Sequence, residues 1–487
     1  MTVRTRMAPS PTGEYHIGHI RTVLYNYAFT KKTGGNFLLR IEDTDRNRYV
    51  EGAVDRILDV IEEYGLSWDE GPRKGGDLGP YVQSERLDIY RDRAEELVQK
   101  GAAYHCFCTT ERLAELRKEQ QDQKLPVTKY DKKCATLSPD EVAKRLADGE
   151  KSVIRLNVPK NKDITFTDIV YGEITINTDA LDDQVLLKSD GYPSYHLAVV
   201  IDDHMMEITH VMRGNDWVPS TPKHVLLYEA FGWDLPEYVH LPNLKELGSS
   251  KKLSKRSGAF YAVDFLELGY LPEAVVNFVM FLGWNPGTEK EIYSIKEFIE
   301  DFDINRIHKT DLVAFDRDKL LWMNGHYIRS METKELHKRI LEWAKRFKKE
   351  IPEEFTKSSG VEVLELIKER LKIFSEVPEL VSYFYKDPEY DEKLLLKFAK
   401  ERSKAIEILN GFKDSFKDVA WEEAQLDKVS HDLLEKGGYK PKEAFMTLRV
   451  AVSGVTATPP IFETLDSLGK EVSLRRIDAA LDVIDSR

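Results

Sequence analysis

The sequence predicts an α/β domain with a parallel sheet, which is divided by an α+β insertion and followed by an all-helical C-terminal half. Strand and helix patterns alternate over about the first 80 residues, as in parallel sheets with right-handed crossovers. Helices then lead into several short strand patterns as far as about residue 190, where the sheet pattern resumes. From about residue 262 onward strand patterns nearly disappear, so the rest of the chain is expected to be helical.

The elements of the first segment follow one another closely. Residues 2–8 read as a short strand, and a proline-rich loop comes after them. A helical pattern covers residues 17–32 and stops at a Gly-Gly pair, which suits a helix C-terminus. Residues 37–41 read as the second strand and residues 54–64 as the second helix. This order predicts parallel strands joined by a helical crossover.

The middle of the chain is predicted to hold an insertion between two halves of the sheet domain. Its helical patterns lie near residues 85–100 and 109–120, and its strand patterns at residues 153–158, 164–170 and 185–188. The sheet pattern returns at residues 195–201, Val211 and residues 239–241, with a helix near residues 219–231. Breaks in the helical half are expected near residue 330 and residues 351–360 and 387–391.

Length and composition predict a multidomain globular enzyme. At roughly 100–200 residues per domain, 487 residues make three or four domains, and 41% apolar with 32% charged residues is typical of soluble proteins. The first residues show no apolar secretory core, and no apolar run approaches the ~20 residues that span a bilayer. Three cysteines are too few, and odd in number, for a disulfide framework, so a reducing, cytoplasmic environment is expected.

The net charge of −13 taken alone argues against a nucleic-acid binder, because phosphate contacts need Lys and Arg. This argument is weak for a large enzyme, since binding requires only a local basic face. Basic residues do cluster at residues 251–256 and again at residues 345–349. Either cluster fits a solvated surface equally well.

A histidine motif, His-Ile-Gly-His at residues 16–19, stands at the predicted turn between the first strand and the first helix. A helix N-terminus attracts phosphate through its free backbone N–H groups, and Gly18 has no side chain to keep a ligand away. His16 and His19 can donate to phosphate oxygens as negative charge builds up in a transition state. Alone, the motif fits an ordinary helix start equally well.

The surrounding motifs are far more specific. Residues 6–13 read Arg-Met-Ala-Pro-Ser-Pro-Thr-Gly, and residues 40–45 read Arg-Ile-Glu-Asp-Thr-Asp. Residues 213–217 read Arg-Gly-Asn-Asp-Trp, residues 322–328 read Trp-Met-Asn-Gly-His-Tyr-Ile, and a C-terminal match covers residues 448–481. With these motifs the chain resembles the bacterial class I glutamyl-tRNA synthetases over essentially its whole length.

The resemblance implies a domain order. A split Rossmann-type catalytic domain is expected at residues 1–85 and 191–247, with an insertion at residues 86–190 that binds the acceptor end of tRNA. A lysine-loop and helical stem-contact domain is expected at residues 248–329, and a helical anticodon-binding domain at residues 330–487.

Lys-Leu-Ser-Lys-Arg at residues 252–256 looks like the lysine-rich loop of class I synthetases. Its ammonium groups, Lys255 first and Lys252 second, would stabilise the anionic phosphorus centre as pyrophosphate leaves. The expected catalytic residues are therefore these two lysines with the two histidines, and flanking glycines would let the loop close over the nucleotide. The expected ATP contacts are Pro9, Ser10, His16, Gly18, His19, Lys252, Ser254 and Lys255.

The resemblance also implies the pocket for the amino acid. A glutamate site needs arginine for bidentate contact with a carboxylate and an acid for the ammonium group. Arg6 and Tyr195 are expected at the side-chain carboxylate and Glu42 near the ammonium group, with Arg213 as a further cation. The expected set is Arg6, Ala8, Ser10, Glu42, Tyr195, Arg213 and Trp217.

Two positions depart from the family pattern. Val199 stands where asparagine is frequent, and Asn215 stands where an acidic residue is commoner. Neither change removes a charge that the chemistry requires.

The glutaminyl relatives typically lack the forms seen at residues 8–13 and 40–45, which favours glutamate as the substrate. A pocket with arginine placed for a carboxylate should reject the neutral amide.

Cys106, Cys108 and Cys134 match three positions of a zinc site that some family members have in the insertion. The usual fourth ligand is a histidine where this chain has Thr136. A structural zinc normally has four protein ligands, and His105 would converge poorly with its neighbour Cys106. Three free, partly buried cysteines are the alternative to Zn²⁺.

The resemblance implies ATP- and Mg²⁺-dependent ligation of L-glutamate to the 3′ end of tRNA(Glu) through a glutamyl-adenylate, by a cytoplasmic monomer whose activation step waits for tRNA. Arg370 falls where the family can place an anticodon contact, and a helix-surface arginine fits equally well. Three alternatives remain: an enzyme that also charges tRNA(Gln), a shortened relative that modifies a tRNA base, and an inactive RNA-binding paralogue. The long helical C-terminus argues against the second, and the intact histidine and lysine motifs argue against the third.

Overall fold

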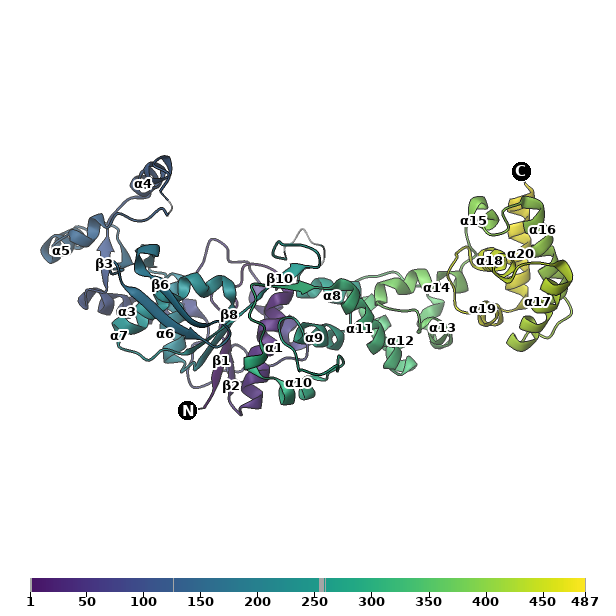
Figure 1. Ribbon diagram of the computed structural model, residues 1–487, viewed down its shortest axis with the longest axis horizontal. Coiled ribbons are helices and arrows are strands. Elements are labelled where there is room, and N and C mark those ends of the chain that lie inside the picture. The colour runs from purple at the N-terminus through teal and green to yellow at the C-terminus, as the bar shows by residue number, and fades with distance from the viewer. Residues whose placement is uncertain (1, 126, 254–257, 259, 487) are drawn as a thin grey trace. The chain divides into compact units, whose positions relative to one another are not determined.

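The structure is a computed structural model that describes residues 2–125, 127–253, 258 and 260–486. The chain divides into two compact units, Met1–Phe265 with Val275–Arg317, and Leu266–Ala274 with Asp318–Arg487. Figure 1 shows the elements of both units. Among the described helices, none combines the length and the apolar character that crossing a membrane requires.

The described strands lie in the first unit. Their bounds are β1 (Arg4–Met7), β2 (Asn36–Leu39), β3 (Ala103–Cys106), β4 (Val153–Leu156), β5 (Asp163–Asp168), β6 (Gly172–Asn177), β7 (Val185–Leu187), β8 (His210–Gly214), β9 (Glu237–Leu241), β10 (Asn243–Glu246) and β11 (Leu312–Phe315). β1 pairs with β2 in parallel, as predicted for a strand–helix–strand unit. Thr209, just before β8, donates its N–H to the carbonyl of Arg4 at 3.0 Å, so β1 also lies beside β8.

Four strands form a sheet in the order β6–β5–β9–β8. β5 pairs antiparallel with β6, whereas β9 runs parallel to both β5 and β8. In this register Arg213 of β8 faces His240 of β9, and Asp168 at the end of β5 faces Tyr238 of β9. The sheet therefore brings three polar residues from distant parts of the sequence into one neighbourhood.

Some of the helices pack against these sheets in the first unit, and the others form the second unit. Up to residue 260 they are α1 (Ile17–Lys32), α2 (Ala53–Glu63), α3 (Leu87–Gln99), α4 (Thr110–Asp122), α5 (Pro139–Ala147), α6 (Tyr195–Met205) and α7 (Thr221–Phe231). Beyond it they are α8 (Ala262–Leu268), α9 (Pro272–Met280), α10 (Ile295–Asp301), α11 (Arg317–Ser330), α12 (Thr333–Arg346), α13 (Ser359–Ile367), α14 (Val377–Tyr385), α15 (Glu392–Leu396), α16 (Arg402–Phe416), α17 (Glu423–Gly437), α18 (Pro441–Ser453), α19 (Ile461–Leu468) and α20 (Lys470–Asp485). Short 3₁₀ turns are η1 (Gln83–Arg86), η2 (Lys133–Thr136), η3 (Thr178–Ala180), η4 (Asn215–Ser220), η6 (Ile304–Arg306), η7 (Glu354–Thr356) and η8 (Phe374–Glu376).

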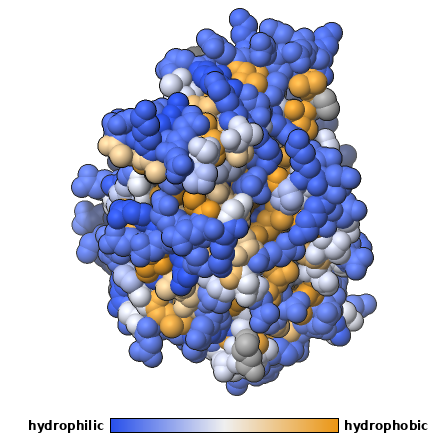
Figure 2. All heavy atoms as spheres, turned by 90° about the vertical axis from the view of Figure 1, so that its left-hand side faces the viewer, coloured by the Kyte–Doolittle hydropathy of each residue, from blue (hydrophilic) through white to orange (hydrophobic). Residues whose placement is uncertain are grey.

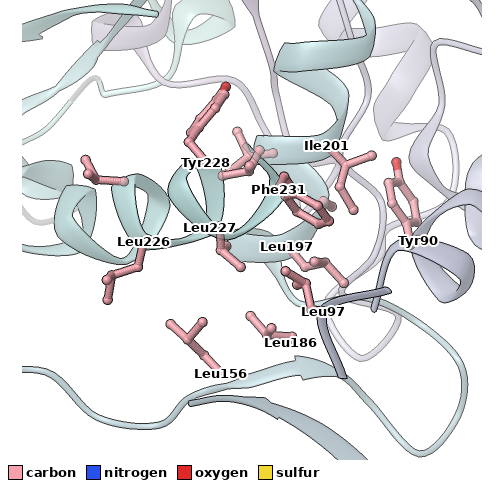
Figure 3. Packing of buried hydrophobic residues seen from close by; sticks show 14 of the residues in the cluster. Tyr90, Leu97, Leu156, Leu186, Leu197, Ile201, Leu226, Leu227, Tyr228 and Phe231 are labelled. Carbon is pink, nitrogen blue, oxygen red and sulfur yellow. The ribbon is translucent and has the colours of Figure 1, made fainter. Parts of the chain in front are cut away.

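A large hydrophobic cluster of the first unit joins helices and strands that are far apart in the sequence. Figure 3 shows side chains of α3, α6, α7, β4 and β7 meeting in one cluster, among them Leu97, Leu156, Leu197 and Leu227. Each fully buried side chain of this size contributes about 1.5–3 kcal/mol relative to an exposed one. The surface is different: Figure 2 shows a face on which hydrophilic side chains prevail, with hydrophobic ones in patches between them.

The prediction of a strand at residues 195–201 was wrong, because these residues form the first turns of α6. Every residue from Leu197 to Asp203 is buried, so the apolar positions show no helical period. Three successive β-branched residues, Val199, Val200 and Ile201, then read like a buried strand. The predicted helix at residues 17–32 coincides with α1. The predicted breaks near residue 330 and at residues 387–391 fall between helices, and the break at residues 351–360 overlaps the first two residues of α13.

Candidate active site

His16 begins α1 and caps it. Its backbone is extended (φ −74°, ψ 144°), and its Nδ1 accepts the N–H of Gly18 at 2.7 Å. Desolvation, with repulsion from His19 and Lys252, lowers the pKa of His16 to about 3. The ring is therefore neutral near pH 7, and because Nδ1 is an acceptor its proton lies on Nε2. This leaves Nε2 as the donor of His16.

His19 stands one turn along α1, with its ring centroid 5.7 Å from that of His16 and 4.9 Å from that of Tyr15. Its side chain reaches solvent, but the protein atoms around its ring displace much of its hydration. This desolvation, with repulsion from Lys252, lowers the pKa of His19 to about 4. Both histidines of the motif are thus neutral donors rather than cations at neutral pH.

The lysine-rich segment is tied to the protein at both of its described ends. Leu253 donates its N–H to the carbonyl of Leu244 in β10 at 2.6 Å. Beyond the segment, the carbonyl of Phe260 accepts the N–H of Ile17 at 3.1 Å, and the ring of Phe260 packs edge-on against His16 with centroids 3.6 Å apart. The segment therefore leaves β10 and returns to the histidine turn. Ser254 and Lys255, both predicted ATP contacts, lie outside the described residues.

Lys252 itself forms an ion pair with Asp216, and both side chains are more than half exposed. A side-chain oxygen of Asp216 also accepts from Asn243 of β10 at 2.6 Å. Next to Asn243 in β10, Leu244 lies beside Gly18, since a Cβ atom on Gly18 would be 3.5 Å from its side chain. The two predicted ATP elements and the loop after β8 thus meet around β10.

Arg6, a predicted pocket residue, makes a bidentate ion pair with Asp203 of α6, at 3.0 and 3.2 Å. Asp203 also accepts from Arg40 at 2.8 Å, and Arg40 in turn pairs with Glu42 at 3.0 Å. Burial alone would raise the pKa of Asp203, but Arg6 and Arg40 hold it below its ordinary value. The charge of Arg6 is therefore largely balanced inside the protein.

The loop after β1 lies against the chain after β2. The N–H of Glu42 donates to the carbonyl of Pro9 at 2.9 Å, and the carbonyl of Ser10 accepts from Thr12 at 2.9 Å. Ala8 is half-buried and Ser10 is exposed. These contacts place the predicted residues of this loop beside Glu42.

Arg213 is held differently from Arg6. Its Nε–H donates to Nε2 of His240 at 3.1 Å and its second terminal nitrogen donates to the hydroxyl of Thr221 at 2.8 Å. The other terminal nitrogen lies 3.3 Å from the hydroxyl of Tyr195 and 3.3 Å from Nδ1 of His224. Among the described residues no carboxylate is within ion-pair distance of this buried guanidinium. Neutral acceptors surround it, so its positive charge is not balanced by an ion pair.

Tyr195 and Trp217 complete this part of the pocket. Their rings stack with centroids 4.2 Å apart, and burial raises the pKa of the Tyr195 hydroxyl, which stays protonated. Val199, one turn further along α6, is buried in the apolar core, so the polar side chain common in the family has no counterpart there. Asn215 donates to the hydroxyl of Tyr171 at 3.2 Å and to the carbonyl of Asp311 at 3.1 Å. The second departure from the family pattern thus has a local structural role.

Sequence reasoning missed the residues that hold the two arginines. Asp203 pairs with Arg6, while Thr221, His224 and His240 contact Arg213. These residues come from α6, α7 and β9, and no local motif links them. Only the pairing of distant strands and helices could have revealed them.

The three cysteines converge in the insertion. Their sulfur atoms all lie within 4.8 Å of one another, and Sγ of Cys108 is 3.6 Å from that of Cys134. The hydroxyl oxygen of Tyr130 lies 3.4 Å from Sγ of Cys106 and 3.2 Å from Sγ of Cys108. In a tetrahedral zinc site two sulfurs would be about 3.8 Å apart, and an oxygen and a sulfur about 3.5 Å apart. Three of the distances among these three sulfurs and the phenol oxygen are therefore close to those in such a site.

Arg370 is exposed just after α13, and no described carboxylate is within ion-pair distance of it. Half-buried Arg449 of α18 lies near enough to repel it: desolvation and then Arg370 lower the pKa of Arg449. Arg449 is oriented by a hydrogen bond from its Nε to the hydroxyl of Thr458 at 2.9 Å. Two neighbouring cations without a described carboxylate partner form a local basic site despite the negative charge of the chain.

The chain matches known proteins along its length. Residues 2–322 match the family described as tRNA synthetases class I (E and Q), catalytic domain, and residues 335–481 match the family described as anticodon binding domain. The glutamate–tRNA ligase of Clostridium kluyveri is 43% identical over 480 residues, which cover 98% of this chain and 97% of that protein. That of Clostridium novyi is 44% identical over 491 residues, covering 99% and 98%.

A solved structure agrees with these matches. The crystal structure of a glutamate tRNA ligase from Elizabethkingia meningosepticum in complex with its amino acid covers 100% of both chains, with a TM-score of 0.86 and 35% identity. The resemblance inferred from the motifs is confirmed, and so is the fold class of an α/β catalytic region followed by helices. The chain belongs to the glutamate and glutamine (E and Q) family of class I tRNA synthetases.

Proposed function

We propose that this enzyme activates L-glutamate with ATP and joins it to the 3′ end of tRNA(Glu). The observation that carries the proposal is that both described ends of the lysine-rich segment lie close to the histidine turn. Phe260 bonds directly to Ile17, and Leu253 bonds to Leu244 of β10, whose side chain lies beside Gly18. The names of its full-length relatives support glutamate as the amino acid.

The reaction has two steps in this proposal. A carboxylate oxygen of glutamate attacks the α-phosphorus of ATP, and the bond to pyrophosphate breaks, giving glutamyl-adenylate. A ribose hydroxyl of the terminal tRNA nucleotide then attacks the carbonyl carbon of the adenylate, losing its proton as AMP leaves. His16 and His19 donate neutral N–H groups to phosphate oxygens, and Lys252 and Lys255 add positive charge as pyrophosphate departs. Mg²⁺ accompanies ATP on the phosphate oxygens and needs few protein ligands.

The same proposal assigns the amino-acid pocket. Arg213 has a charge that no described carboxylate balances, so it and Tyr195 are placed at the side-chain carboxylate, with Arg6 beside them. Glu42 is placed near the ammonium group, and Ala8, Ser10 and Trp217 line the pocket. Pro9 and Gly18 let the backbone approach the nucleotide, where Ser254 is a further contact.

We also propose a structural Zn²⁺ on Cys106, Cys108 and Cys134, with Tyr130 rather than Thr136 as the fourth ligand. The spacing of the three sulfurs and the phenol oxygen supports this set. When bound, the ion would link β3 to the segment that contains η2. Reduced thiols are required, which suits a cytoplasmic enzyme.

For tRNA, the proposal keeps the acceptor end at residues 86–190, within a catalytic region that also includes residues 1–85 and 191–247. Residues 248–329 would contact the stem and residues 330–487 the anticodon, with Arg370 as one contact and its neighbour Arg449 as a second.

The expected result of Arg370→Gln is a KM for tRNA raised by about tenfold with the glutamate KM unchanged, measured by charging. Glu369→Gln, an adjacent exposed substitution, is the control.

The test is charging with labelled glutamate and ATP, using separate transcripts of tRNA(Glu) and tRNA(Gln). Charging of tRNA(Glu) alone supports a discriminating enzyme that acts, as we propose, as a monomer. Charging of both transcripts would keep the chemistry and replace the proposed tRNA specificity. Charging of neither by folded protein would overturn the proposal in favour of an RNA-binding paralogue.

A further inference from the structure

A buried chain of hydrogen bonds crosses three neighbouring strands and ends on Arg213. Asp168 at the end of β5, His240 of β9 and Arg213 of β8 are joined by distances of 2.7 Å, from Oδ2 of Asp168 to Nδ1 of His240, and 3.1 Å, from Nε2 of His240 to Nε of Arg213. The side chains of Asp168 and His240 are fully buried. The strand order β5–β9–β8 makes this chain of hydrogen bonds possible, although Asp168 and His240 are 72 residues apart in sequence and His240 and Arg213 are 27 apart.

The hydrogen bonds of Asp168 fix it as an acceptor at both oxygens. Oδ1 accepts the backbone N–H groups of Val170 and Tyr171, at 3.0 and 2.9 Å. Oδ2 accepts both the backbone N–H of His240 and the Nδ1–H of its ring. Both oxygens therefore face donors, and the carboxylate orients the ring from the side opposite Arg213.

This arrangement selects one tautomer of His240. Burial, more than any other cause, lowers the pKa of His240, so the ring is neutral and carries one proton. That proton lies on Nδ1, facing Asp168, and Nε2 is left as the acceptor that Nε–H of Arg213 requires. The opposite tautomer would set an N–H group against the N–H of Arg213.

The guanidinium of Arg213 is consequently fixed in its plane. His240 holds Nε, and Thr221 holds one terminal nitrogen, while the other terminal nitrogen points at the hydroxyl of Tyr195. A planar guanidinium that is oriented in advance pairs with a carboxylate in a definite geometry. Its supporting residues thereby help to decide how well a carboxylate is distinguished from an amide.

We propose that Asp168 and His240 are positioning residues that set the affinity for the glutamate side chain and its discrimination from glutamine, by orienting Arg213. The inference rests on the proposed function, in which Arg213 contacts the side-chain carboxylate. Neither residue touches the substrate in this scheme. Their removal should therefore affect the KM for glutamate far more than the KM for ATP.

The test uses the full-length enzyme in tRNA-supported pyrophosphate exchange, with glutamate and glutamine as separate substrates. Three variants are compared. His240→Leu removes the acceptor of the Arg213 hydrogen bond, whereas the side-chain oxygen of His240→Gln can still accept it. Asp168→Asn replaces one carboxylate oxygen by an NH₂ group, which faces N–H donors and cannot accept from them. Matched controls in the same sheet are His210→Leu, in the strand β8 beside β9, and exposed Asp163→Asn, in the same strand as Asp168. Melting temperatures and active-site titration measure how much of each variant is folded.

We expect His240→Leu and Asp168→Asn to raise the KM for glutamate by about 10- to 100-fold, the effect of losing a hydrogen bond to a charged group. As the KM for glutamate rises, the preference for glutamate over glutamine should fall. The KM for ATP should stay within about twofold of that of the unaltered enzyme. The KM of His240→Gln for glutamate should lie much closer to that of the unaltered enzyme. A merely structural role would instead lower the melting temperature and the active fraction, without changing the glutamate KM of the molecules that remain folded.

Arg213→Gln separates this inference from the proposal on which it rests. If Arg213→Gln raises the glutamate KM and His240→Leu does not, the positioning role is overturned and the pocket assignment stands. If Arg213→Gln leaves the glutamate KM unchanged, the pocket assignment fails and the positioning role fails with it. Should His240→Leu not fold, Asp168→Asn and His240→Gln decide the question by the same KM criterion.

Discussion

A Cβ atom on Gly18 would lie 2.8 Å from Nδ1 of His16, in the space that their hydrogen bond occupies. Any side chain at this position must therefore move the imidazole or the first turn of α1. We expect Gly18→Ala to lower the rate of pyrophosphate exchange by about 100-fold, since losing one aligned donor to a developing charge has an effect of this size. The KM for glutamate should change little. An exchange rate close to that of the unaltered enzyme would show that the orientation of His16 is not needed.

The neutral state of the two motif histidines predicts the pH dependence of activation. Desolvation lowers the pKa of His16 to about 3 and that of His19 to about 4. Both rings thus keep their single proton between about pH 5 and 8, and would gain a second one only at lower pH. We expect the exchange rate at saturating substrates to show no inflection near pH 6.5. An inflection there that disappears in His19→Gln would contradict this.

The ion pair between Lys252 and Asp216 predicts a competition for the lysine. Both side chains are more than half exposed, so the pair contributes little to stability, on the order of 0–1 kcal/mol. ATP phosphates must draw Lys252 away from Asp216 if this lysine contacts them. Asp216→Asn should therefore lower the KM for ATP by about two- to fivefold, with an unchanged melting temperature. The control is Asp234→Asn, because Asp234 is exposed. Glu246 lies nearer but pairs with Arg317, so its substitution would disturb a second ion pair.

Metal analysis checks the proposed zinc ligands. The purified enzyme should contain about one Zn²⁺ per chain, and a strong chelator should lower its melting temperature. Cys134→Ser should abolish stoichiometric zinc, whereas Tyr130→Phe should weaken binding by removing the proposed fourth ligand. Thr136→Ala, next to the cluster, should leave zinc content unchanged. A zinc-free enzyme with the same melting temperature before and after chelation would rule the site out.

Asp203 predicts a large effect on stability. It balances both Arg6 and Arg40 inside the protein, and its side chain is 4% exposed. Asp203→Asn leaves two buried arginines with one carboxylate fewer and should lower the free energy of unfolding by about 3–5 kcal/mol. Urea titration measures this, with exposed Glu207→Gln as the control. A change below about 1 kcal/mol would mean that the arginines find other partners.

The sequence predicted those parts of the fold in which local pattern and environment agree. α1 has a Gly-Gly stop and a regular helical pattern, and its predicted span coincides with the structure. α6 was mistaken for a strand because it is buried on all sides, which removes the periodicity on which the prediction depended. Burial of a whole element is a property of the tertiary structure, so no local reading could have corrected this error.

The residues of the candidate site likewise fall into two groups, those that a sequence motif marks and those that only tertiary contacts reveal. The motifs identified the residues that we propose to contact substrates, such as His16 and Arg213, because short motifs mark them. They did not give Asp168 or His240, whose contact depends on a strand pairing across about 70 residues. The sequence left the cysteines open between a zinc site and three free thiols, and Tyr130 was found only from the position of its hydroxyl.

The hydrogen bond between the carbonyl of Arg4 and the N–H of Thr209 has a consequence for synthesis of the chain. The second residue of this pair is made 205 residues after the first. At about 5–20 residues per second, the ribosome needs roughly 10–40 s to deliver it. During this time β1 can pair with β2 but not with the chain before β8, so one of its two edges stays uncovered. In the helical unit, the hydrogen bond from Arg476 to the carbonyl of Tyr383 spans 93 residues, so its second partner follows the first in less than half that time.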